Sequence, residues 1–237
     1  MGVSRLGWIL FCALVAALAT QAIFVAFAPA PEDRPWTPLD LRAPVGAFTG
    51  RKLAALRDDP ARCHRLLQEA GIGFAAIGTR RVSASCGWDD AVRLATTARA
   101  PRPAVPLSCP MAAGIDLWMR RVVQPAAIEL LGSRVATVEE FGSYACRRMN
   151  GDASGPWSEH ATADAIDIAG FRLADGRRVT VVRDWPSGPR GAFLHRARDG
   201  ACRLFATTLS PDYNAAHRDH LHLDQAARGA LGWRACG

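Results

Sequence analysis

Four of the six histidines in this 237-residue chain lie in two short windows of sequence. Residues 157–168 contain His160 and Asp167, and residues 217–224 contain His217, His220 and His222. Neutral imidazole is the commonest metal ligand, and a catalytic zinc ion takes three His, Asp or Glu ligands and keeps one position open. We therefore predict that His160, Asp167 and His222 bind Zn²⁺.

The geometry of β-strands limits how these residues can meet. His160 and Asp167 are seven positions apart, so one regular strand would point them to opposite faces. We expect His160 on the loop that enters a strand and Asp167 within that strand. His220 and His222 are two positions apart and share one face of a second strand, and His217 can bend toward the same site. His220 and His222 could both be ligands, or one could bind metal while the other contacts substrate.

The rest of the pattern predicts an α+β domain with a small central antiparallel sheet and flanking helices. Asp59 and Pro60 mark the start of one helix, and Gly71 marks its end. Apolar residues at helical spacing predict a longer helix over 109–131, which Pro125 should kink or interrupt. The other expected elements are strands at 74–77, 135–141, 165–171, 178–182 and 220–223, a helix at 192–207 and an irregular segment at 86–94.

An apolar stretch near the N-terminus indicates export. Residues 6–28 match the ~20 apolar residues that a transmembrane helix needs, and Arg5 places residues 1–5 in the cytoplasm by the positive-inside rule. We predict an uncleaved, single-pass signal anchor in the cytoplasmic membrane, then a Pro-rich linker at 29–48. The domain at 49–237 would lie in the periplasm or outside the cell. Cleavage after Ala28 is the alternative, which Pro29 disfavours.

Cysteine usage agrees with export. Cys12 lies in the apolar segment, and six cysteines follow it. An even number in an exported domain predicts disulfides, and the absence of a C-x-x-C pair argues against a cysteine zinc site. Among the fifteen connectivities that six cysteines allow, we expect sequential pairing: Cys63–Cys86, Cys109–Cys146 and Cys202–Cys236.

The net charge of +7 comes almost entirely from arginine, because Lys52 is the only lysine. A basic surplus can favour nucleic acid, anionic lipid or an acidic wall polymer. The arginines are scattered along the chain, and no nucleic-acid-binding motif accompanies them. We expect no nucleic-acid partner.

The two histidine windows resemble the motifs of a known group of enzymes. Ser158-x-His160-x(6)-Asp167, followed by His217-x-x-His220-x-His222, resembles the LAS group of zinc peptidases. That group contains D-Ala-D-Ala carboxypeptidases and peptidoglycan endopeptidases, including the penicillin-insensitive murein endopeptidases. The fuller pattern, from 142–148 through 158–160 to 214–220, resembles the bacterial extensin-like C-terminal domain. The resemblance runs from about residue 36 to the C-terminus and implies a LAS/hedgehog-like metallopeptidase core.

The resemblance also implies roles for single residues. His160, Asp167 and His222 would bind zinc, and His217 or His220 would act as general base or stabilise the tetrahedral intermediate. Arg147 or Arg148 would contact the carbonyl or carboxylate of the substrate.

Residue type and position give the remaining expectations. Ser158 would either contact substrate or cap the loop before His160. His64 and His195 would be structural, Asp164 and Asp224 would be solvated or hold a histidine, and Ala163 replaces a glycine of the relatives.

Three functions follow from these expectations. The first is a zinc-dependent peptidase or amidase that hydrolyses peptidoglycan, as a carboxypeptidase or an endopeptidase, on the outer side of the membrane. The second is a non-catalytic wall-binding module with a retained metal site, against which the two additional histidines argue. The third is an exported scaffold whose histidines only stack at the end of a strand. The expected partners are peptidoglycan and, through the N-terminal helix, the membrane.

Overall fold

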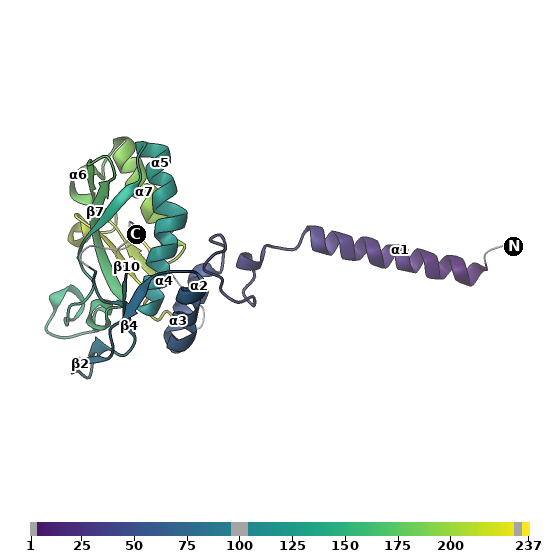
Figure 1. Cartoon of the computed structure of the whole chain (residues 1–237), viewed down its shortest axis with the longest axis horizontal. Coiled ribbons are helices and arrows are strands. Elements are labelled where there is room, and N and C mark those ends of the chain that lie inside the picture. The colour runs from purple at the N-terminus through teal and green to yellow at the C-terminus, as the bar shows by residue number, and fades with distance from the viewer. Residues whose placement is uncertain (1–3, 96–103, 230–233) are drawn as a thin grey trace.

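The computed structural model describes residues 4–95, 104–229 and 234–237. Helix α1 (Arg5–Ala26) extends away from the remainder of the chain as a separate rod (Figure 1). Its 22 residues span about 33 Å at 1.5 Å per residue, slightly more than the ~30 Å hydrocarbon core of a bilayer. By length and composition α1 can therefore cross a membrane, a test that a signal sequence near an N-terminus also passes.

The segment after α1 becomes part of the folded domain earlier than we predicted. A short 3-10 helix, η1 (Pro31–Asp33), follows the first prolines. Leu39 and Leu41 are buried in the main core, and Arg120 donates a hydrogen bond to the Leu41 carbonyl at 2.8 Å. The predicted spacer at 29–48 is therefore wrong in its second half, because two leucines among the prolines provide enough apolar surface to pack.

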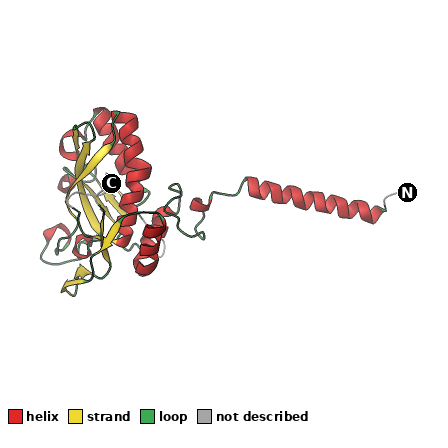
Figure 2. Cartoon of the chain, in the orientation of Figure 1, coloured by secondary structure: helices red, strands yellow, loops and turns green. Residues whose placement is uncertain are grey.

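One sheet organises the domain, and helices cover it (Figure 2). Its strands run in the order β11-β9-β10-β7-β6, and β8 pairs with β7 outside this path. All pairings are antiparallel except that of β11 with β9. The strand bounds are β6 Val135–Gly142, β7 Ala165–Leu173, β8 Arg178–Thr180, β9 Thr207–Leu209, β10 Leu221–Asp224 and β11 Ala235–Cys236. The predicted α+β class with an antiparallel sheet is confirmed.

Two smaller sheets lie at the N-terminal side of the domain. One has the order β1-β4-β5, and the other is the hairpin β2-β3. The bounds are β1 Phe74–Ala76, β2 Arg80–Ser83, β3 Cys86–Trp88, β4 Ala91–Leu94 and β5 Leu107–Ser108. Our prediction of an irregular segment at 86–94 is wrong. Strands of three or four residues show little alternation of their own, and these form by pairing with β2 and β1.

The longest continuous helical run packs against the central sheet, and its start and interruption follow from local chemistry. Ser108 caps α4 by accepting a hydrogen bond from the Met111 N–H at 3.3 Å. Pro125 has no N–H to bond back along the helix, and the helix accommodates it by widening into a π-helical turn, η3, just before it. The helix continues to Gly132, whose left-handed φ of 68° ends it.

The remaining helix bounds are α2 Thr49–Ala54, η2 Ala55–Asp58, α3 Pro60–Glu69, α4 Cys109–Trp118, η3 Met119–Val123, α5 Gln124–Leu131, η4 Met149–Gly151, η5 Glu159–Thr162, α6 Val181–Asp184, α7 Gly188–Cys202 and η6 Ala215–His217. The Asp59 cap of α3 is confirmed, since its carboxylate accepts from the Arg62 N–H at 3.0 Å. The predicted helix at 192–207 is displaced. It starts four residues earlier, with Pro189 in the first turn, and it ends before Thr207 because Thr207 begins β9.

A cluster of buried aromatic rings joins the long helix to the sheet and to α7. The Trp118 ring lies 5.9 Å from that of Phe171 in β7 and 6.5 Å from that of Phe205, and Phe171 lies 5.1 Å from Phe193 of α7. The Trp118 indole N–H donates to the Ala197 carbonyl at 2.8 Å. Full burial with a satisfied indole makes this cluster the packing centre behind the sheet.

Three disulfides join segments that are distant in sequence. Cys63 pairs with Cys109, Cys86 with Cys146, and Cys202 with Cys236. The expected Cys202–Cys236 bridge is confirmed, whereas the expected 63–86 and 109–146 bridges are wrong. Nearness in sequence does not decide pairing here, because α3 packs on α4 and brings the first and third cysteines of the domain together.

The buried Cys63–Cys109 bridge should contribute strongly to stability. Its sequence separation of 46 gives about 4 kcal/mol in the loop-entropy estimate. We expect the Cys63→Ala/Cys109→Ala variant to lose about 2–4 kcal/mol of unfolding free energy in chemical denaturation followed by tryptophan fluorescence. Cys12→Ser is the control, because Cys12 is exposed on α1. Equal stability of both variants would contradict the prediction.

Candidate metal centre

The pairing of β7 with β10 brings two of the predicted ligands together. Asp167 in β7 lies directly opposite His222 in β10, so both side chains project from the same face of the sheet. His160 lies in η5, the 3-10 turn that leads into β7. The predicted arrangement, with His160 before the strand and Asp167 within it, is the one the structure has.

The three side chains converge on one point. His160 Nε2 lies 3.2 Å from His222 Nδ1 and 3.2 Å from Asp167 Oδ2, and His222 Nδ1 lies 2.9 Å from Asp167 Oδ1. Four ligands at zinc-bond lengths of 2.0–2.1 Å in a tetrahedron are separated by about 3.3 Å from one another. The observed separations are therefore close to those of a tetrahedral ligand set.

Neighbouring acceptors orient both histidines toward this point. His160 Nδ1 donates to the Ser143 carbonyl at 3.2 Å, which directs Nε2 toward Asp167. His222 Nε2 donates to Asp224 Oδ2 at 3.1 Å, which leaves Nδ1 on the side of the convergence point. Outer hydrogen bonds of this kind set the tautomer and the basicity of metal-bound histidines. The donor set thus fits a zinc ion in residue type, spacing and orientation.

The electrostatics of the centre favour a cation. Burial opposes ionisation of Asp167, but hydrogen bonds from His160 and His222 hold the pKa of Asp167 well below its ordinary value. Burial would lower the pKa of His222, but hydrogen bonds to Asp167 and Asp224 outweigh it and raise the pKa to about 9. In the metal-free protein a proton on His222 therefore supplies the positive charge that these carboxylates require.

Two more histidines border the convergence point. The His217 ring lies 5.2 Å from that of His220 and 6.0 Å from that of His222. His217 Nδ1 donates to Asn214 Oδ1 at 2.8 Å, and His220 Nδ1 donates to Asp219 Oδ1 at 2.9 Å. Each ring thus keeps its Nε2 available, and His220 Nε2 lies 3.5 Å from Asp167 Oδ1. Burial, with help from His220 and His222, lowers the pKa of His217 to about 4, so its ring is neutral at neutral pH.

Three predicted substrate contacts lie on the loop that runs beside η5. Ser158 caps the turn, because its Oγ accepts from the His160 N–H at 3.3 Å, which is the structural one of the two roles we considered. The Arg148 guanidinium lies 4.5 Å from the centre of the Trp157 ring and donates to the Gly155 carbonyl, so it holds the loop. The Arg147 side chain is exposed, and its carbonyl accepts from the Ser158 N–H at 3.1 Å.

The two aspartates expected to be solvated or to hold a histidine differ in role. Asp224 holds His222, as expected. Asp164 is buried away from the histidines, bonded to Arg57 and Ser108, and burial raises the pKa of Asp164 to about 7. Ala163 lies between His160 and Asp164 and turns the chain with a left-handed φ of 56°. Glycine adopts this conformation without strain, which gives a physical reason for the glycine that the relatives have at this position.

Another group of possible ligand atoms comes together within the described ranges, at His64, Asp90 and Cys109. Cys109 is bonded to Cys63 and offers no thiolate. His64 and Asp90 form a pair at 2.8 Å, and His195 stacks on Trp185 with ring centres 4.2 Å apart. The two histidines outside the windows have structural contacts.

Sequence reasoning missed several residues that shape the centre. The Ser143 carbonyl orients His160, and the Asn214 side chain orients His217. These contacts cannot be predicted from residue type alone. Phe141 and Tyr213 are exposed and place their rings 6.0 Å from His220 and 5.8 Å from His217. Tyr213 gave a usable signal in the sequence, because it is an aromatic residue four positions before His217.

Zinc binding at neutral pH should release protons. His222, with a pKa of about 9, is protonated at pH 7.5 and must lose its proton to become a ligand. We expect about one proton per zinc ion at pH 7.5, from calorimetry in buffers that differ in ionisation enthalpy. The release should fade above pH 9, and affinity should fall as the pH drops.

Asp224→Asn should lower the pKa of His222, reduce the proton release and weaken zinc affinity about 10- to 100-fold. Asp175→Asn, at an exposed aspartate paired with Arg177, is the matched control. Proton release that does not change between pH 7 and pH 10 would contradict the assignment of His222.

Comparison with known proteins agrees with the fuller motif. The family model "Extensin-like protein C-terminus" matches residues 61–237, a span that includes both histidine windows and all six bonded cysteines. No curated protein and no solved structure matches the chain. The match covers well over half of the chain, and the chain therefore belongs to the extensin-like C-terminus family.

Proposed function

We propose that this protein is a zinc-dependent peptidase or amidase that hydrolyses bonds in peptidoglycan. The observation on which the proposal rests is the convergence of His160, Asp167 and His222 on one point, beside two histidines with available Nε2 atoms. A purely structural zinc site is closed by four protein ligands, whereas a catalytic site has three and an open position. Three converging ligands with adjacent bases favour catalysis over a structural role.

His217 is the better placed general base. Its Nδ1 hydrogen is committed to Asn214, so Nε2 presents a lone pair to the site. In a hydrolytic reaction this nitrogen would accept a proton from the attacking water and return it to the leaving amine. The chemistry that a zinc ion supplies when bound is activation of water at neutral pH and polarisation of the scissile carbonyl.

His220 would have a different role because of its partner. The Asp219 carboxylate lies 2.9 Å from Nδ1 and holds the ring, while Nε2 lies 3.5 Å from Asp167 Oδ1. From this position His220 would stabilise the negative charge that develops on the carbonyl oxygen of the substrate. The two histidines, which the sequence left equivalent, would thus divide into a base and a stabilising donor.

Substrate binding would use the exposed rim of the site. Phe141 and Tyr213 flank the histidines and offer apolar surface to an extended chain. The Arg148 side chain is occupied by its loop contacts, whereas the described Arg147 side chain is exposed. Arg147 is therefore the better candidate to contact a carbonyl or carboxylate of the substrate.

A location outside the cytoplasm would support a wall polymer as substrate. If α1 acts as a signal anchor, it would leave the domain on the outer side of the cytoplasmic membrane, where peptidoglycan lies. The three disulfides agree with an oxidising compartment. Family membership and compartment together favour peptidoglycan stem peptides or their amide links over soluble proteins.

Replacing a metal ligand and replacing the general base should affect zinc binding and turnover differently. We expect the zinc-loaded full chain to cleave peptide or amide bonds of purified peptidoglycan. We expect His160→Ala to lose both zinc and product, and His217→Ala to keep zinc while turnover falls about 10²- to 10⁴-fold. Arg196→Ala, at an exposed residue of α7, should leave both unchanged.

Chromatography of the products and metal analysis of the same samples give the two readouts. A wild-type chain that binds one zinc ion and the wall polymer but releases no product would instead identify a wall-binding module. A folded chain that binds no metal would reject both functions.

A further inference from the structure

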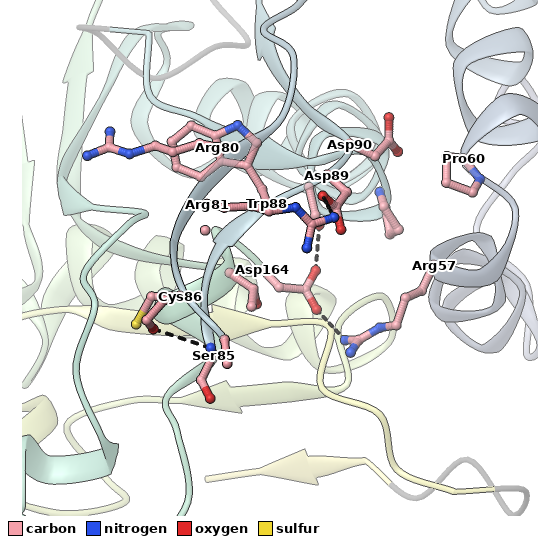
Figure 3. A pocket seen from close by; sticks show the side chains of 16 residues that line it. Arg57, Pro60, Arg80, Arg81, Ser85, Cys86, Trp88, Asp89, Asp90 and Asp164 are labelled. Atoms are coloured by element: carbon pink, nitrogen blue, oxygen red, sulfur yellow. Dashed lines mark hydrogen bonds and ion pairs between the residues drawn. The ribbon is translucent and has the colours of Figure 1, made fainter.

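A cavity of about 500 Å³ lies beside the turn that holds His160, on the side of the β2–β3 hairpin and the start of α3 (Figure 3). Arg81, Ser85 and Trp88 line it from the hairpin, Arg57 reaches it from the opposite side, and Asp164 projects into it from the segment after η5. Its volume falls within the ~300–1,000 Å³ usual for small-ligand sites. The cavity adjoins the metal centre, but its described lining contains none of the three ligands.

The charged side chains of this cavity already have partners within the protein. Arg57 binds Asp164, Arg81 lies 2.8 Å from Asp89, and His64 lies 2.8 Å from Asp90. The Arg80 guanidinium lies 5.3 Å from the centre of the Trp88 ring and 5.1 Å from that of Tyr144. The three arginines and three aspartates of the described lining balance in formal charge. A strongly charged ligand would be attracted by some of these groups and repelled by others. The balanced charge of the lining therefore favours a neutral ligand.

The cavity is nevertheless rich in hydrogen-bonding groups. Each guanidinium has five N–H donors, of which an ion pair uses one or two, and each carboxylate has about four acceptor positions. Arg81 and Asp89 are 76 % and 66 % exposed, so their remaining donors and acceptors are accessible. The hydroxyl groups of the serine and threonine residues in the lining add further donors and acceptors.

One wall of the cavity is a rigid aromatic ring. The Trp88 indole N–H donates to the Gly78 carbonyl at 2.9 Å, and the ring packs edge-to-face with Tyr144 at 5.0 Å. The Arg80 guanidinium lies over part of this ring, 5.3 Å from its centre, and the indole lines the cavity beside dense donors and acceptors. Such a wall suits a ligand that has apolar C–H groups and many hydroxyl or amide groups. A pyranose ring has both.

We propose that this cavity is a second binding site, for a neutral saccharide segment of a glycan strand. The proposal rests on the proposed function for the identity of the polymer as peptidoglycan, and it adds that the chain recognises the sugar backbone as well as the peptide. The Cys86–Cys146 bridge ties the hairpin to the segment from Ser143 to Ala145, which bonds both the ring and the carbonyl of His160. A glycan held here would lie at a fixed distance from the metal centre.

The test measures binding of an uncharged, peptide-free probe, the β-1,4-linked tetramer of N-acetylglucosamine, to the metal-free full chain in detergent. We expect saturable binding by calorimetry that is weakened at least tenfold in Arg81→Ala/Asp89→Ala and to a smaller degree in the isosteric Asp89→Asn. Arg196→Ala/Glu129→Ala removes another exposed ion pair, at 2.7 Å, and should bind as the wild type does.

Because the assay needs neither zinc nor turnover, its outcome is independent of the hydrolase proposal, and His160→Ala should bind the tetramer normally. Thermal unfolding of each variant confirms that it is folded. Absence of tetramer binding by the folded wild-type chain would overturn the proposal. Equal weakening of tetramer binding in the cavity variant and the control variant would also overturn it. So would a sugar-free stem peptide that displaces the tetramer at a concentration below that of the tetramer.

Discussion

The structure around the candidate site depends on one constraint: three acceptor atoms of His160, Asp167 and His222 lie about as close together as the ligands of a single ion. Lone pairs at such separations repel unless a cation or a proton lies between them. The antiparallel register that places Asp167 opposite His222 makes this approach unavoidable once β7 and β10 pair. The same pairing is central to the sheet, so forming the fold also forms the site.

The surrounding structure removes the freedom by which these groups could avoid one another. Ser143 and Asp224 hold the two imidazole rings from behind, and Ser158 caps the turn that presents His160. Disulfides tie the adjoining loops to the domain, and the aromatic cluster around Trp118 supports the sheet from the opposite side. Such a site is preorganised, and binding a metal ion requires exchange of a proton more than movement of the backbone.

The turn from Glu159 to Thr162 separates two environments of different chemistry. On one side, histidines oriented by neighbouring acceptors surround Asp167. On the other, Asp164 is buried against Arg57 at the cavity beside the hairpin. Ala163 has a left-handed backbone conformation and turns the chain between them. His160, before it, faces the metal centre, and Asp164, after it, faces the cavity. Under our two proposals, a single turn would align bond hydrolysis with recognition of the polymer on which the bond is found.

The sequence by itself determined the candidate ligands, the loop-and-strand placement of His160 and Asp167, the α+β class, the long helix with its interruption near Pro125, and an N-terminal helix long enough to span a membrane. These follow from residue type and from periodicities over a few positions. Tertiary structure decided which cysteines pair, that β3 and β4 exist, that Leu39 and Leu41 belong to the core, and that Arg148 holds a loop. It also decided that the Ser143 carbonyl orients His160 and that Asp164 faces a cavity. Each of these depends on contacts between segments far apart in the chain, and local spacing contains no information about which distant segment will be the neighbour.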